Sequence, residues 1–150
     1  MTVTRRTLVA ALLLAAVIAG CKKDTTTSPT TTTTTTTTTG ATPTVTDSFT
    51  SRLPVGGTVA FPFTVVEFGA VSATLSSVTG TGVPTTVQLR LGLGTISDDG
   101  SCATSSQALA KASTTAQVTT SMTAGTYCVV VQDVGNLFAP ATVQFSVLHP

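Results

Sequence analysis

Apolar and polar residues alternate along most of the chain after position 45. In 127–131 and 143–147, valine or aromatic residues occupy every second position. This period of two predicts half-buried β-strands. About seven short strands are expected, at 49–53, 59–65, 71–75, 87–91, 116–120, 127–131 and 143–147. Glycine-containing turns separate them, so the pattern predicts an all-β, antiparallel two-sheet β-sandwich of the immunoglobulin-like or jelly-roll type.

Two segments modify this pattern. Pro62 lies inside a predicted strand, and because proline lacks an amide hydrogen, that strand is expected at a sheet edge. Residues 105–113 include Gln107, Ala108, Leu109 and Lys111, which favour helix. This segment is short, so we predict a loop with one helical turn.

The first 20 residues have the layout of a secretory signal. Arg5 and Arg6 precede an apolar segment at 8–19, and small residues follow. A bilayer requires about 20 apolar residues to span it, so this segment is predicted to be a cleaved leader rather than a permanent transmembrane helix.

Ile18-Ala19-Gly20-Cys21 resembles the lipobox of bacterial lipoproteins. The resemblance implies that Cys21 is acylated, that the chain is cut before it, and that the acyl chains hold the protein on a membrane. Lys22 in place of aspartate implies the outer membrane, facing the periplasm or the cell surface. The alternative is an ordinary secretory signal followed by a chance cysteine.

Threonine dominates the chain from 25 to 43. The segment lacks the large apolar residues that would offset the entropy of ordering, so it is expected to be a disordered spacer. An O-glycosylated stalk is the alternative. The predicted organisation is therefore a signal peptide at 1–20, a lipidated tether at 21–44 and a β-sandwich at 45–150.

Charge excludes one class of partner. The whole chain has seven Lys and Arg residues against six Asp and Glu residues, and two of the arginines leave with the leader. The mature chain is close to neutral and offers no basic patch for phosphates, so nucleic acid is not an expected partner.

Removing Cys21 from the cysteine count leaves Cys102 and Cys128, an even pair in an exported domain. We predict a structural disulfide between them. The alternative is a redox or metal-binding pair, but the chain has no Cys-x-x-Cys spacing and no histidine near either residue.

Ala124-Gly125-Thr126-Tyr127-Cys128-Val129 resembles a turn-to-strand signature of extracellular sandwich domains. Together with an early Gly-x-x-x-Phe-x-Phe strand, a central Ala-Thr-Leu strand and a closing Phe-x-Val strand, it is similar to the bacterial pre-peptidase C-terminal domain. The resemblance implies an exported accessory module in which the Tyr127 hydroxyl bonds to upstream backbone. Some relatives bind calcium, for which Asp98, Asp99 and Asp133 are candidates, although ordinary turn chemistry also explains these residues.

No catalytic constellation is evident. The single histidine, His149, is next to the last residue, where chain ends are usually mobile. The single glutamate, Glu67, is expected to be exposed. We therefore predict no enzyme activity and no cofactor.

Binding remains the favoured class. Leu137 and Phe138 form an apolar pair within a turn region and are a candidate contact patch, or else they cover the open end of the sandwich. The expected function is a membrane-anchored lipoprotein whose sandwich binds an unidentified protein or glycan. The alternatives are a structural or envelope-associated lipoprotein without a discrete ligand, and an accessory domain of a secreted hydrolase.

Overall fold

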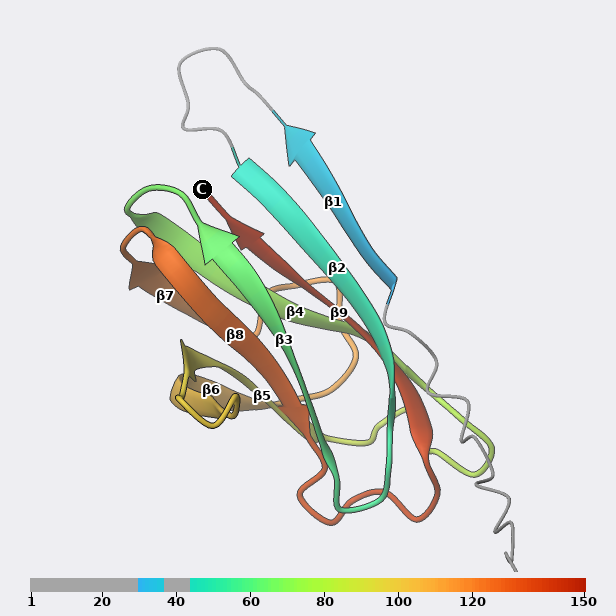
Figure 1. Ribbon diagram of the computed structural model, residues 1–150. Helices are drawn as coiled ribbons and strands as arrows, with labels where there is room; N and C mark the ends of the chain where they lie inside the picture. The colour runs from blue at the N-terminus through green and yellow to red at the C-terminus, as the bar shows by residue number, and fades with distance from the viewer. Residues whose placement is uncertain (1–29, 37–43) are drawn as a thin grey trace, which may run out of the picture.

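Residues 30–36 and 44–150 are described by the computed structural model, and they form nine β-strands (Figure 1). These strands are β1 (Thr30–Thr36), β2 (Thr44–Leu53), β3 (Thr58–Val65), β4 (Gly69–Thr79), β5 (Leu89–Ile96), β6 (Cys102–Ala110), β7 (Val118–Met122), β8 (Gly125–Gln132) and β9 (Ala141–His149). The leader and Cys21 lie outside the described residues. Within the described ranges no helix is long and apolar enough to cross a membrane.

The strands form two antiparallel sheets. One sheet has the order β1-β2-β9-β4-β7 and the other the order β3-β8-β5-β6. Strands that are neighbours in sequence often lie in different sheets, as β2 and β3 do, and the two sheets face each other (Figure 1). The predicted two-sheet antiparallel β-sandwich is confirmed, with nine strands in place of about seven.

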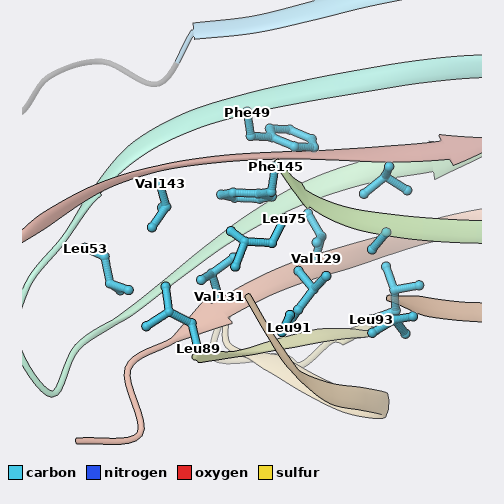
Figure 2. Packing of buried hydrophobic residues seen from close by; sticks show 14 of the residues in the cluster. Phe49, Leu53, Leu75, Leu89, Leu91, Leu93, Val129, Val131, Val143 and Phe145 are labelled. Carbon is cyan, nitrogen blue, oxygen red and sulfur yellow. The ribbon is translucent and has the colours of Figure 1, made fainter. Parts of the chain in front are cut away.

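Apolar side chains from both sheets fill the space between them (Figure 2). Phe49 and Phe145 come from the five-stranded sheet and stack with ring centroids 5.4 Å apart, and Phe61 of the other sheet lies 5.1 Å from Phe49. The alternating valines and leucines of β5, β8 and β9 are buried, and in β8 Val130, on the other face, is buried as well. Inward-facing residues thus explain why the period of two predicts seven of the strands.

The tether departs from expectation over seven residues. Thr30–Thr36 forms β1, which pairs with β2 from Thr30–Thr50 to Thr36–Thr44. All seven side chains are exposed, so alternation could not reveal this strand. Threonine nevertheless favours β structure because it is branched at Cβ, and the free edge of β2 supplies hydrogen-bond partners.

Residues 105–113 also differ from the prediction. They belong largely to β6, an edge strand that pairs with β5, and not to a loop with a helical turn. Most of its side chains are exposed, which hides any alternation. Pairing with β5 overrides the local helix preference of the Gln-Ala-Leu-Ala segment. By contrast, Pro62 lies in β3 at the edge of its sheet, as predicted.

The sandwich has two ends, which we name by a residue at each. The Asp133 end carries the loops at 54–57, 80–88 and 133–140. The Pro150 end carries the loops at 66–68 and 97–101 and the C-terminus, which lies at the top of Figure 1.

Candidate functional site

The two cysteines of the folded domain are joined. Cys102 of β6 and Cys128 of β8 form a disulfide with a Cα–Cα distance of 5.8 Å. Strand β5 lies between β6 and β8 in the sheet, so the bond ties together two strands that are not hydrogen-bonded to each other. The predicted disulfide is confirmed, and it fixes the edge strand β6 to the centre of its sheet.

Tyr127 lies at the start of β8, directly before Cys128. Its hydroxyl donates to the carbonyl oxygen of Thr123, 3.1 Å away, and also lies 3.1 Å from the Thr123 hydroxyl. Its ring packs against Phe63, with ring centroids 6.0 Å apart. The hydrogen bond to upstream backbone closes the turn between β7 and β8, which is a structural role.

Asp133 is the most heavily bonded carboxylate in the described part of the chain. Its Oδ1 accepts from the backbone amides of Gly135, Asn136 and Leu137, and its Oδ2 accepts from that of Gly56. The side chain is only 4% exposed. Burial alone would raise the pKa of Asp133, but the four amide donors outweigh it and hold the pKa below its ordinary value.

These bonds join two loops at the Asp133 end. The Asp133 amide also donates to the Gly57 carbonyl over 2.9 Å, so the 54–57 turn and the 133–140 loop are tied at both the side chain and the backbone. Gly56 and Gly135 have φ values of 66° and 96°, a region that favours glycine. The two loops form one rigid tip, which lies at the bottom of Figure 1.

The three calcium candidates are not brought together. Asp98 and Asp99 lie in the 97–101 loop at the Pro150 end, whereas Asp133 lies at the other end. Asp99 accepts hydrogen bonds from the hydroxyl and the amide of Ser101, which lower its pKa. Within the described ranges, no three His, Cys, Asp or Glu side chains form a group that could hold a metal ion. Turn formation accounts for Asp99 and Asp133.

The expectation of a mobile His149 is wrong. It is the last residue of β9, and its side chain is only 3% exposed because its ring packs against Phe63, with ring centroids 5.5 Å apart in a tilted arrangement. Nε2 lies 3.2 Å from Oδ2 of Asp47, and Nδ1 lies 3.0 Å from the Pro150 carbonyl oxygen. The other oxygen of Asp47 accepts from the Thr33 hydroxyl of β1 over 2.8 Å. Both ring nitrogens are occupied in holding the chain end and β1 in place.

The candidate contact patch divides into two parts. Leu137 is 3% exposed and belongs to the core, whereas Phe138 is 87% exposed. Leu137 therefore packs against the core, as the second of the two alternatives states, with its amide held by Asp133, and Phe138 alone is left as a candidate contact residue. Glu67 is exposed, as expected.

Sequence reasoning missed two exposed apolar residues at the same end of the sandwich as Phe138. Val55 and Val134 are 51% and 37% exposed, and they lie in the two loops that Asp133 joins. Together with Phe138 they form what we call the apolar tip. Each valine precedes a glycine with positive φ, Gly56 or Gly135, so an apolar residue beside a predicted turn glycine was the available signal.

Two hollows lie elsewhere on the described surface. One of about 240 Å³ is lined by Pro84, Thr86, Val87, Gln88 and Asn136 at the Asp133 end. The other, of about 170 Å³, is lined by residues of β3 together with Ile96, Gly100 and the disulfide. Neither of these two hollows is lined by a charged side chain.

No model of a known protein family matches this chain, and no curated protein matches it.

Proposed function

We propose that this protein is an exported, membrane-anchored lipoprotein whose β-sandwich is a non-catalytic binding module. The observation that carries the proposal is the Cys102–Cys128 disulfide. Disulfides persist mainly in oxidising compartments outside the cytosol. The chain has three cysteines, so this pair leaves Cys21, in its lipobox-like context, as the one free for acylation.

The state of the ionisable side chains supports binding over catalysis. Asp133 and His149 are both buried and engaged in structural hydrogen bonds. The rigid loops at the Asp133 end instead present apolar side chains to solvent, an arrangement suited to surface contact. The membrane, through Cys21, is one partner, and a protein or glycan is the other. The similarity to pre-peptidase C-terminal domains fits this accessory role.

Protease treatment of intact cells that express the full chain tests the location. Loss of the folded domain from intact cells places it on the outer surface and directs the search to external ligands. Survival until the cells are permeabilised places it in the periplasm and directs the search to envelope proteins and cell wall.

The anchor is tested in parallel with Cys21→Ser. The wild type is expected in the membrane fraction and the variant in the soluble fraction, because the acyl chains supply the membrane affinity. Equal fractionation of the two proteins would contradict the proposal.

A further inference from the structure

We propose that the apolar tip, formed by Val55, Val134 and Phe138, contacts the lipid surface to which the chain is anchored. The proposal rests on the proposed acylation of Cys21. It assigns the membrane as the partner of the Asp133 end of the sandwich, and it fixes the orientation of the domain.

The first argument is the direction of β1. Because β1 is antiparallel to β2, its first residue, Thr30, pairs with Thr50 near the Asp133 end, and its last residue lies toward the other end. The chain that leads from Cys21 therefore joins the sandwich from the side of the apolar tip. Docking of β1 also shortens the link to the membrane, since only residues 22–29 separate the acylated residue from the first strand.

The second argument is distance. Val55 lies five residues beyond Thr50, the last two of them past the end of β2, so the two are at most ~17 Å apart at about 3.4 Å per residue. The nine residue steps from Cys21 to Thr30 span about 30 Å when fully extended, and a coil of that length averages ~15–18 Å. The average span of the segment from Cys21 to Thr30 therefore matches the distance from Thr50 to the apolar tip, so the acyl chains and the tip can both lie at the membrane surface without full extension of that segment.

Val66 and Phe68, the exposed apolar side chains of the 66–68 loop at the Pro150 end, fit the length of the link less well. The pairs Ser72–Leu148 and Leu148–Thr46 place Phe68 about eight residues from Thr50 in the opposite direction, or ~27 Å. That distance is close to the fully extended limit of the link. The neighbouring Glu67 is exposed, which disfavours contact with an anionic lipid surface.

The third argument is charge. Arg52, which is exposed, pairs with Thr142 near the Asp133 end, and Arg90 pairs with Gln132 at the same end. The acidic residue at this end, Asp133, is ionised and offsets one of these two positive charges, but its carboxylate is buried and bonded to four amides, so the exposed charge is that of Arg52. Lys111 is the remaining Lys or Arg of the described ranges. It directly follows Ala110 of β6, which pairs with Leu89 at the start of β5, so Lys111 also lies toward the Asp133 end.

The exposed carboxylates of Glu67, Asp98 and Asp99 all lie in loops at the Pro150 end. The domain is therefore polarised along its length, with its exposed arginine near the apolar tip. Anionic lipids attract basic side chains near their surface, so this polarity favours the same orientation as the length of the link.

Tryptophan fluorescence tests the orientation, because the chain contains no tryptophan. Phe138→Trp and Phe68→Trp are matched variants, since both phenylalanines are exposed, by 87% and 71%, at opposite ends. Each full-length acylated protein is reconstituted into vesicles of phosphatidylcholine and phosphatidylglycerol with plain or brominated acyl chains. Bromine quenches only a tryptophan that lies at the lipid.

We expect the F138W protein to show blue-shifted emission and to lose most of its fluorescence in brominated vesicles, and the F68W protein to remain unchanged. Equal brightness of F138W in both vesicles would overturn the proposal, as would equal quenching of both variants. A blue-shifted but unquenched F138W would overturn it in favour of a second copy or another protein covering the tip.

The mass of the same sample separates the two proposals. An acylated protein with an unquenched tip overturns the orientation alone, whereas an unacylated mass overturns the anchor and the orientation together. A further variant, Thr32→Pro with Thr33→Pro, weakens the β1–β2 pairing. The amide groups of adjacent residues point to opposite sides of a strand, so one of these two residues points its amide toward β2, and proline at that position removes the hydrogen bond. This variant is expected to stay acylated and to show weaker quenching of F138W.

Discussion

Asp133→Asn tests whether one carboxylate holds the Asp133 end together. In the wild type two oxygens accept four backbone amides. Asparagine keeps one oxygen and turns an NH₂ group toward at least one amide donor, and it removes the negative charge. Hydrogen bonds to charged groups contribute about 1.5–3 kcal/mol each and a buried unpaired donor costs a further 1–3 kcal/mol, so we expect a total loss of ~2–4 kcal/mol after partial relaxation.

For a domain of this size, each kcal/mol corresponds to about 4 °C in Tm. Thermal unfolding at neutral pH should therefore show the D133N midpoint ~8–16 °C below that of the wild type. Asp99→Asn is the matched control, because Asp99 also has a lowered pKa but lies on an exposed loop, and its shift should be much smaller.

The pH dependence gives a second readout. Since the pKa of Asp133 is lower in the folded state than in the unfolded chain, where it is about 3.9, its stabilising effect is fully present above pH ~4 and is lost as the pH falls through the folded-state value. The difference between wild type and D133N should shrink in acid. Equal midpoints at neutral pH, or a difference that grows in acid, would refute the reasoning.

Three further predictions follow from the contacts of β8, β6 and β1. Replacing Cys102 and Cys128 by serine should lower the free energy of unfolding by about 3.5 kcal/mol for a sequence separation of 26 residues, measured by urea denaturation; an unchanged midpoint would contradict it. Tyr127→Phe removes the bond to the Thr123 carbonyl and should cost about 1 kcal/mol in the same assay. Asp47→Ala removes the acceptor of the Thr33 hydroxyl, so amide exchange of residues 30–36 should accelerate while that of β8 stays slow; uniform acceleration would instead indicate global destabilisation.

The fold was predictable where burial imposes alternation on the sequence. Val143, Phe145 and Val147 are fully or almost fully buried and stand at every second position of β9. Strands β1 and β6 escaped prediction because they lie at sheet edges and bury almost no side chains. For such strands backbone pairing, which leaves no pattern in the sequence, decides the structure.

The candidate site was predictable only in part, for a similar reason. Cysteine number and context are sequence properties, so the Cys102–Cys128 bond could be foreseen. The role of Asp133 depends on backbone amides from Gly56 and from the three-residue segment 135–137. Gly56 lies 77 positions from Asp133 in the sequence, so local patterns could not reveal this contact. The apolar tip likewise joins residues from two distant loops, and local reading of Leu137 and Phe138 could not tell which of them points inward.

The measurement that tests the account most directly is the intact mass of the mature protein purified from the membranes of the cells that produce it. The account predicts a chain that begins at Cys21, carries acyl chains on that residue and retains the Cys102–Cys128 disulfide. A mature chain that begins at any other residue, or one that begins at Cys21 without acyl chains, would contradict it.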